Sequence, residues 1–557
     1  MLIHTGPIAG IAAHGEWIAT AGYDNKLILW NAADKTALAQ GVHDHLINSC
    51  SFSNDGKWLV SASSDYSARV WSLPSMRLEA VLSGHEDDVD MAVFSPDSRF
   101  IATCALDRLV RVFDRKGQCL IEFKGHTGNV LALAWTHDGQ HVISTSVDGT
   151  IRQWSIETRA MSKCNDLQVR TDSIEISSSG LIYAGDDLGR IARIDESNIS
   201  YVFAHQAGIK KVVLDDKLNQ LVCLSYDGFL SVWDITNSTP IEISRSKLPE
   251  NIWARSAAIL KDGRVVAGTF GSTYAIYDCQ TSLWDMSGVK AGSAINAVAS
   301  NDGKTYSVGD AGDVFENNSL IASMGSLCNF LVCSQDLLLS GGQLGKLFNA
   351  RTAEVLYEHH SPLNCAVCFE HHNQNYVAVG AYTGEIIIFL SDKNSVRFMH
   401  LIKVYENAVK GVSVAKGQLF SVCANTDIAW HSIENFELQN YINKAHQKIT
   451  NDCCAIDDDR FATISRDRDL KIWNGKSHEI FPSPHPNSVK CICINDDRSK
   501  LLTGSYGGTL AMFDVLKKKW MKYDRPTTAG ISDIAWDDKH QQFLASSYDG
   551  NIYSLVA

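Results

Sequence analysis

Residues 125–154 read GHTGNVLALAWTHDGQHVISTSVDGTIRQW, and this stretch decides the fold. It contains three short runs, Val130–Trp135, His141–Ser146 and Thr150–Trp154. A Thr-His-Asp-Gly turn joins the first two runs, and the tight turn of Asp148 and Gly149 joins the last two. Short apolar runs bounded by Asp-Gly are typical of antiparallel strands connected as hairpins. The stretch therefore predicts one small antiparallel sheet.

The same unit recurs from one end of the chain to the other. One residue marks the turn before the third strand of each copy: Asp24, Asp65, Asp107, Asp148, Leu188, Asp227, Gly271, Ala311, Leu344, Thr383, Ala424, Asp467, Gly507 and Asp549. A period of about 40 residues with four strands per unit is the signature of β-propeller blades. We therefore predict an all-β chain of fourteen blades, each a four-stranded antiparallel sheet.

The repeat resembles the WD40 family. His126 lies where the family has its Gly-His pair, Asp148 at its turn aspartate and Trp154 at the tryptophan of its Trp-Asp pair, although Ser155 follows here. The resemblance covers essentially the whole chain, and in architecture and length it extends to double-propeller proteins such as the actin-interacting protein type. Because one propeller carries about 4–8 blades, we predict two seven-bladed WD40-type propellers in tandem, over residues 1–284 and 285–557.

Two topologies could close the rings. Met1–Ile3 precedes His4 as an apolar run precedes the other blade histidines, so it is predicted to be an outer strand. Leu283 and Trp284 lie between the two halves and could complete a blade of either. In the simpler topology, Met1–Ile3 closes the first ring and Leu283-Trp284 closes the second. In the alternative, Met1–Ile3 completes the last blade of the second ring.

Histidine, aspartate and tryptophan recur together in the strong copies. The resemblance implies a buried hydrogen-bonded chain in each blade, from the histidine through a hydroxyl of the second strand to the tryptophan, with the turn aspartate holding the histidine. A buried Asp and His stabilise a fold only when they are paired. The residues at these positions are His43, Asp65, His85, Asp107, His126, Asp148, Trp154, His205, Asp227, Trp233, His446, Asp467 and Trp473.

Repeated His–Asp pairs could be mistaken for catalytic dyads, but one pair per blade is spread around a ring, whereas catalytic groups must converge. The clusters His43-Asp44-His45, His359-His360 and His371-His372 could ligate a metal, yet the first belongs to a blade and the others fall in predicted loops. The fifteen cysteines are scattered without a second pair at zinc-site spacing. We therefore predict no catalytic residue, no metal and no cofactor.

The net charge of −13 argues against sequence-independent binding of nucleic acid, which depends on clustered Lys and Arg. No apolar stretch reaches the ~18 residues of a membrane span, and no basic segment followed by an apolar one opens the chain. With its many scattered cysteines, the chain is predicted to be cytoplasmic. No exposed heptad suggests built-in dimerisation, so a monomer or a subunit of a hetero-complex is expected.

In the family, the residue before the turn aspartate lies on the narrow face of the ring, beside the central channel. In the first ring, blades six, seven and one are neighbours, so Tyr226, Phe270 and Tyr23 are expected to form a continuous aromatic arc. In the second ring the corresponding residues are Tyr382, Arg466, Tyr506 and Tyr548. Aromatic and Arg side chains are frequent interface anchors, although Tyr at this position could simply shield the hairpin. The acidic stretch Glu86–Asp88 suits a basic or amphipathic peptide.

The leading hypothesis is a non-enzymatic scaffold or adaptor that binds partner proteins or peptides on the propeller faces. Because fold does not fix function, two alternatives stay open. The chain could be the regulatory subunit of a separately encoded enzyme. It could also be an enzyme or small-ligand sensor that uses a central channel, which would require several ionisable side chains with perturbed pKa values in one pocket.

Overall fold

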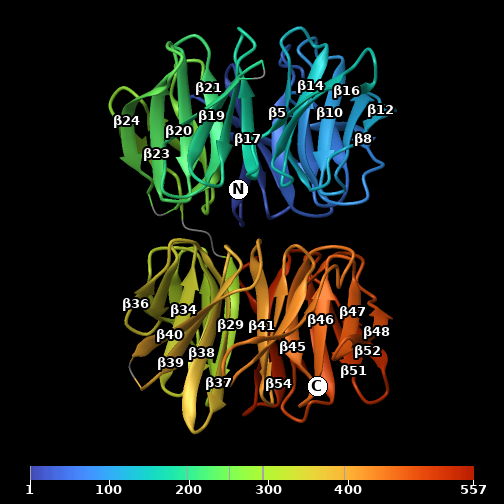
Figure 1. The fold of residues 1–557 in the computed structure, drawn as a ribbon, viewed down its shortest axis with the longest axis vertical. Coiled ribbons are helices and arrows are strands. Elements are labelled where there is room, and N and C mark those ends of the chain that lie inside the picture. The colour runs from blue at the N-terminus through green and yellow to red at the C-terminus, as the bar shows by residue number, and fades with distance from the viewer. Residues whose placement is uncertain (1, 197, 250, 291–293, 394) are drawn as a thin grey trace. The chain divides into compact units, whose positions relative to one another are not determined.

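The computed structural model describes residues 2–557 except 197, 250, 291–293 and 394. Every regular element in this part of the chain is a β-strand, as predicted (Figure 1). Contacts divide the chain into two compact units, residues 1–291 and 292–557.

The first unit contains seven four-stranded antiparallel sheets, each with its strands in chain order. Their strands are β1 (Ile8–His14), β2 (Trp17–Gly22), β3 (Lys26–Asn31), β4 (Ala37–Val42); β5 (Ile47–Phe52), β6 (Trp58–Ser63), β7 (Ala68–Ser72), β8 (Arg77–Leu82); β9 (Val89–Phe94), β10 (Phe100–Ala105), β11 (Val110–Asp114), β12 (Cys119–Phe123); β13 (Val130–Trp135), β14 (His141–Ser146), β15 (Thr150–Ser155), β16 (Ala160–Asp166); β17 (Thr171–Ile176), β18 (Ile182–Asp186), β19 (Arg190–Asp195), β20 (Asn198–Phe203); β21 (Ile209–Asp215), β22 (Gln220–Ser225), β23 (Phe229–Asp234), β24 (Ile241–Lys247); β25 (Ile252–Ile259), β26 (Val265–Thr269), β27 (Ala275–Asp278) and β28 (Leu283–Asp285).

The second unit contains six four-stranded sheets and a final three-stranded sheet. Their strands are β29 (Ile295–Asn301), β30 (Lys304–Gly309), β31 (Asp313–Glu316), β32 (Ser319–Ser323); β33 (Cys328–Ser334), β34 (Leu337–Gly342), β35 (Lys346–Asn349), β36 (Glu354–Glu358); β37 (Leu363–His371), β38 (Gln374–Ala381), β39 (Glu385–Ser391), β40 (Val396–Lys403); β41 (Val409–Ala415), β42 (Gln418–Cys423), β43 (Ile428–Ser432), β44 (Leu438–Ile442); β45 (Thr450–Ala455), β46 (Arg460–Ser465), β47 (Asp469–Asn474), β48 (Ser477–Pro482); β49 (Val489–Ile494), β50 (Lys500–Ser505), β51 (Leu510–Asp514), β52 (Lys519–Asp524); and β53 (Ile531–Asp537), β54 (Gln542–Ser547), β55 (Ile552–Val556).

Burial explains why these runs form blades. Second strands such as β14 are buried at nearly every residue, because both of their faces pack against neighbouring blades. Outer strands such as β16 are largely exposed. The turn after β14 needs a glycine, because Gly149 has a φ of +78° and a Cβ there would lie 3.0 Å from the Val169 nitrogen. The core therefore lies between sheets, where Trp154 packs with Val142 and Phe123.

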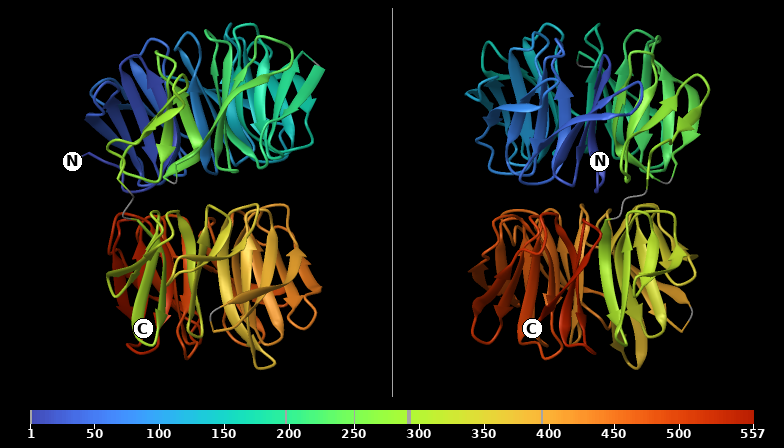
Figure 2. Two further views of the ribbon diagram at one scale, coloured as in Figure 1. Left: turned by 90° about the vertical axis from the view of Figure 1, so that its left-hand side faces the viewer. Right: turned by 180° about the vertical axis from the view of Figure 1, so that it is seen from behind.

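Each unit closes into a ring of seven blades. The first strand of each sheet packs against the first strand of the next, β25 packs back on β1, and β53 packs back on β29 (Figure 2). In the second unit, side-chain amides of first strands donate to the following blade, as Asn364 Nδ2 does to the Val409 carbonyl at 2.6 Å. At its closing point the Ser532 hydroxyl donates to the Ile295 carbonyl. These side-chain hydrogen bonds fasten one blade to the next across the ring.

Of the two places left open for Leu283 and Trp284 the structure selects the first ring, and the outer strand predicted at the start of the chain is absent from the described residues. Leu283–Asp285 forms β28 and pairs with β27, so it completes the seventh blade of the first unit instead of closing the second. Leu2 and Ile3 belong to no strand, and Met1 lies outside the described residues. The division into domains 1–284 and 285–557 stays a prediction, although the pairing of Asp285 with Ile276 places that residue in the first unit. A strand of three residues is too short to show a periodic pattern, so tertiary contacts, such as that of Trp284 with Tyr277, decide which blade it completes.

Candidate interaction faces

The blade of β13–β16 shows how a complete hydrogen-bonded chain is built. His126 Nδ1 lies 2.9 Å from Asp148 Oδ2, and its Nε2 lies 2.8 Å from the Ser144 hydroxyl. The Trp154 indole donates to the same hydroxyl at 2.8 Å. The hydrogen-bonded chain therefore ties the loop before β13 to the strands β14 and β15 inside the protein, where hydrogen bonds are strong.

The other histidine–aspartate pairs have the same geometry. The Nδ1 atoms of His43, His85, His205 and His446 lie 2.8–2.9 Å from the carboxylates of Asp65, Asp107, Asp227 and Asp467. The indoles of Trp233 and Trp473 donate to Ser231 and Thr463. Burial raises the pKa of Asp107, but the hydrogen bond and charge of His85 outweigh it and lower the pKa to about 2. One such set in each of several blades fits a role in holding the blade.

A further complete set occurs in the first blade, which the sequence analysis did not assign. His4 contacts Asp24 at 2.9 Å and Thr20 at 2.7 Å, and the Trp30 indole donates to the Thr20 hydroxyl. The backbone N–H of His4 also donates to the Ser272 carbonyl of the seventh blade. The residues before β1 therefore help to close the first ring, without forming a strand.

The predicted aromatic arc of the first unit is only partly assembled. Trp253, which the sequence analysis missed, lies between two of its members, with ring centroids 5.2 Å from Tyr23 and 5.5 Å from Phe270. Arg255 lies over both Tyr23 and Trp253 and donates to the Tyr23 hydroxyl at 2.7 Å. Phe270 is only 3% exposed, whereas the Arg255 side chain is 34% exposed. The accessible part of this cluster is therefore its Arg–Tyr edge.

Tyr226 packs against a charged group instead. The Lys210 ammonium lies 5.1 Å from the centre of its ring. Lys210 also contacts Asp172 and Asp187, each at 2.5 Å, and Arg170 contacts Asp172 at 2.7 Å. Burial lowers the pKa of Lys210, but the two aspartates outweigh it and raise the pKa. The cations on this side of the first unit are thus neutralised within the chain.

The predicted residues of the second unit lie beside lysines from first strands. Lys410 lies 5.8 Å from the ring centre of Tyr382, which is 37% exposed, and Arg466 lies 5.6 Å from that of Tyr506. Burial, followed by the positive charges of Lys490 and Arg466, lowers the pKa of Lys410 to about 7. Burial also raises the pKa of Tyr548, in the blade of β53–β55, well above its ordinary value. The second unit therefore gathers cations and tyrosines at this face.

Of the missed residues, the lysines follow a sequence pattern, whereas Trp253 and Arg255 are marked only by the structure. Lys210, Lys410 and Lys490 each follow an apolar residue that opens the first strand of a blade. Trp253 and Arg255 lie in β25 where its register to β26 shifts between Ile252 and Ala257. The acidic stretch is also less available than expected, because Asp88 is 3% exposed and accepts a hydrogen bond from Ser64.

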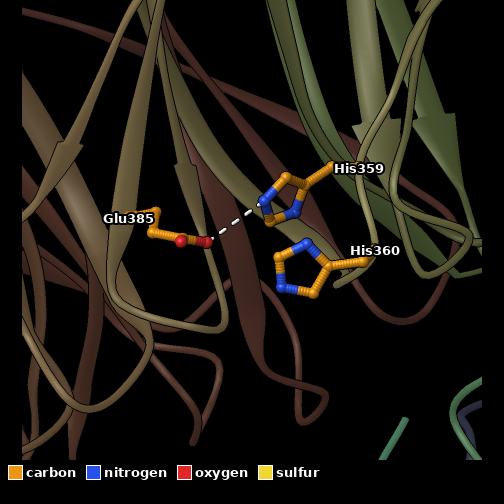
Figure 3. Close-up of side chains that lie close together, drawn as sticks. All are labelled: His359, His360 and Glu385. Carbon is orange, nitrogen blue, oxygen red and sulfur yellow. Dashed lines mark hydrogen bonds and ion pairs between the residues drawn. The ribbon is translucent and has the colours of Figure 1, made fainter. Parts of the chain in front are cut away.

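Two histidine clusters bring metal-type ligands together. His359 and His360 lie near Glu385, and His371 and His372 lie near Glu434; in each group the possible ligand atoms lie within 4.8 Å of one another. Figure 3 shows both rings of the first group beside the Glu385 carboxylate. The sequence predicts both pairs in loops and no metal. His359 and His360 do lie in a loop, whereas His371 is the last residue of β37, so the loop prediction is wrong there. The sequence does not pair either cluster with a carboxylate.

Five segments of the chain match a known family of repeats. The family model described as "WD domain, G-beta repeat" matches residues 2–31, 39–72, 76–114, 117–155 and 476–514. The chain carries WD40 repeats. Its matched WD40 segments include the blade of β13–β15 with its complete hydrogen-bonded chain. Among the described residues there is no helix long and apolar enough to cross a bilayer.

Curated relatives are similar over parts of the chain. The nuclear distribution protein nudF of Aspergillus niger is 33% identical over 131 residues, which cover 20% of this chain and 30% of that protein. The ribosome biogenesis protein WDR12 homolog of Drosophila mojavensis is 25% identical over 317 residues, covering 52% of this chain and 64% of that protein. The chain thus spans less than two thirds of the length of these relatives.

Proposed function

We propose that this WD40-repeat chain is a non-catalytic scaffold that binds partner proteins on the blade ends carrying the Asp-Gly turns. In the first unit the contact would center on Tyr23 and Arg255, at the edge of the aromatic cluster. We also propose a cytoplasmic location, in which the fifteen cysteines, all free thiols, stay reduced.

The observation that carries the proposal is the packing of Arg255 over Tyr23 and Trp253. Aromatic and Arg side chains held rigidly at the rim of a surface lose little conformational freedom on binding, which is why they are frequent energetic anchors. The titratable groups of the blades support a scaffold as well, because each His–Asp pair is used inside its own blade. The names of the similar proteins, in nuclear distribution and ribosome biogenesis, are compatible with work inside assemblies.

A photo-crosslinking experiment tests the proposal. A photoreactive amino acid would replace Tyr23 in one variant and Leu218 in another, in the cells that produce the protein. Leu218 is 55% exposed and lies in the turn between β21 and β22, at the opposite end of a blade. We expect a discrete crosslinked protein from the Tyr23 position that is absent from the Leu218 position. An Arg255→Ala change is expected to weaken that crosslink at least tenfold.

Two outcomes would overturn the proposal. Crosslinking of the same protein from both positions would place its contact elsewhere than on the turn-bearing end. Failure of the Tyr23 position to crosslink any protein, in a variant with unchanged urea unfolding, would contradict partner binding at this face.

A further inference from the structure

The third blade of the second unit, β37–β40, keeps the blade histidine but has lost its partners. Its turn, Ala381 to Glu385, aligns with Ser146 to Thr150 of the complete blade through the same strand pairing. In that alignment Thr383 replaces the turn aspartate, Val379 replaces the hydroxyl residue and Phe389 replaces the tryptophan. His359, which aligns with His126, therefore has neither the aspartate nor the hydroxyl that the other blades provide.

The ring of His359 makes different contacts as a result. In the complete blades Nδ1 faces the aspartate and Nε2 faces the hydroxyl, whereas His359 Nε2 faces Glu385 Oε2 at 3.1 Å. Its Nδ1 lies 3.1 Å from the Ser361 carbonyl. Glu385 opens β39 and accepts a further hydrogen bond from the Thr383 hydroxyl. The histidine is thus aimed at a carboxylate that the repeat pattern does not require.

A second imidazole completes the group. His360 follows directly, and its ring centroid lies 4.2 Å from that of His359. The side chains of His359 and Glu385 are 5% and 12% exposed, while His360 is more than a third exposed, so the group is partly sheltered and partly open to solvent. Both imidazoles and the carboxylate can place one ligand atom within 4.8 Å of the others.

We propose that His359, His360 and Glu385 bind a divalent transition-metal ion of the zinc class. Zinc prefers nitrogen and oxygen donors of this kind in a tetrahedral arrangement. With metal–ligand bonds of about 2.0–2.1 Å, neighbouring tetrahedral ligands lie about 3.3 Å apart, close to the separation of His359 Nε2 and Glu385 Oε2. The fourth position faces the open side, where water or a ligand from a partner protein would bind.

Contacts around the group support the assignment. Metal-bound histidines usually donate their second ring N–H to a carbonyl, which leaves the other nitrogen available to the metal. The Ser361 carbonyl lies 3.1 Å from His359 Nδ1 and can accept that hydrogen in the metal-bound tautomer, whereas in the other tautomer Nδ1 accepts from the Ser361 backbone N–H at 3.2 Å. The Thr383 hydroxyl in turn fixes the orientation of the Glu385 carboxylate.

The second cluster provides a matched comparison within the same unit. His371 and His372 lie 3.3 and 3.2 Å from the two oxygens of Glu434, which comes from the turn of the next blade. His372 and Glu434 are 72% and 62% exposed, so nothing shelters a bound ion from water on most sides. An equally histidine-rich but more exposed group is therefore available as a control.

Titration of the metal-free full chain with Co²⁺ tests the proposal. Tetrahedral cobalt gives visible d–d absorption, and Zn²⁺ should abolish that signal by competition. We expect one Co²⁺ per chain, at least tenfold weaker binding in His360→Ala and in Glu385→Gln, and unchanged binding in His372→Ala. Glu385→Gln keeps the size and hydrogen bonds of the side chain, and urea unfolding in a chelator checks that each variant is folded.

Three results would overturn the proposal. The first is absence of Co²⁺ and Zn²⁺ binding at micromolar concentrations. The second is binding that survives both His360→Ala and Glu385→Gln. The third is binding lost in His372→Ala, which would assign the ion to the other cluster.

Discussion

Lys210 and Lys410 occupy the same position within a blade, in the sixth blade of the first unit and the fourth blade of the second. Each is the second residue of the first strand of its blade, and each lies over the ring of a tyrosine that precedes a turn. Tyr226 belongs to the blade of Lys210, whereas Tyr382 belongs to the blade before that of Lys410. Their electrostatic surroundings are opposite. Lys210 contacts Asp172 and Asp187, and its pKa is raised. Lys410 lies near Lys490 and Arg466, and its pKa is lowered to about 7.

The difference shows what a repeat fixes and what it leaves variable. The blade geometry gives the second residue of a first strand the same position within the blade in both rings. The neighbouring blades then decide whether a cation there is neutralised. A buried ion pair is costly to break, whereas a cation among other cations is costly to keep. Lys210 thus stabilises the first unit. Lys410, when charged, lowers the stability of the second unit, which fits a surface that binds a partner.

The largest effect is expected from removing the two lysines. Lys210→Met should lower the free energy of unfolding by about 2–3 kcal/mol, because Asp172 and Asp187 lose a buried counterion. Lys410→Met should change it by less than about 1 kcal/mol, or raise it, because one of several mutually repelling cations is removed. Urea unfolding of the full chain measures both, with exposed Lys247→Met as the control. Equal destabilisation by both changes would break the comparison.

A smaller effect is expected from pH. Between the folded pKa of Lys410, about 7, and the ordinary lysine value of about 10.4, the unfolded chain binds a proton that the native chain does not. The contribution of Lys410 to stability therefore rises with pH across this window. Relative to Lys410→Met, the wild type should gain up to about 1 kcal/mol per pH unit between pH 7.5 and 9.5.

The same pH series on Lys210→Met serves as the control. The raised pKa of Lys210 keeps it charged in both folded and unfolded chains over this window, so its contribution to stability should stay constant until the ordinary lysine value is passed. The comparison would lose its basis if the two lysine variants showed the same pH dependence.

The smallest effect concerns the tyrosines under the lysines. A cation over an aromatic ring contributes about 0.5–1 kcal/mol, and a neutral amine contributes no such term. Tyr382→Leu should therefore destabilise the chain more at pH 6 than at pH 9, because Lys410 loses its charge in between. Tyr226→Leu should have the same effect at both pH values. Urea midpoints at the two pH values would detect a difference of about 0.5 kcal/mol.

The sequence predicted the blades and the histidine–aspartate positions because both depend on short-range patterns. Hairpin turns and alternating apolar residues are local, and the repeat holds each His at a fixed interval from its turn. Trp253 and Arg255 could not be predicted in this way, because they lie where the pairing of β25 with β26 shifts and the strand no longer follows the repeat. The predicted aromatic arc therefore lacks Trp253, whose ring lies between those of Tyr23 and Phe270.

By itself the sequence determined an all-β chain of WD40-type blades, the turn before the third strand of each blade, and the side chains that recur in the strong copies. Only the tertiary structure decided that Leu283–Asp285 completes the first ring, that Lys210 is neutralised while Lys410 is not, and that His359 and His360 meet Glu385. The physical reason is the range of the interactions. Strand and turn preferences act within a few residues, whereas charge compensation and ligand convergence depend on side chains brought together from different strands and blades.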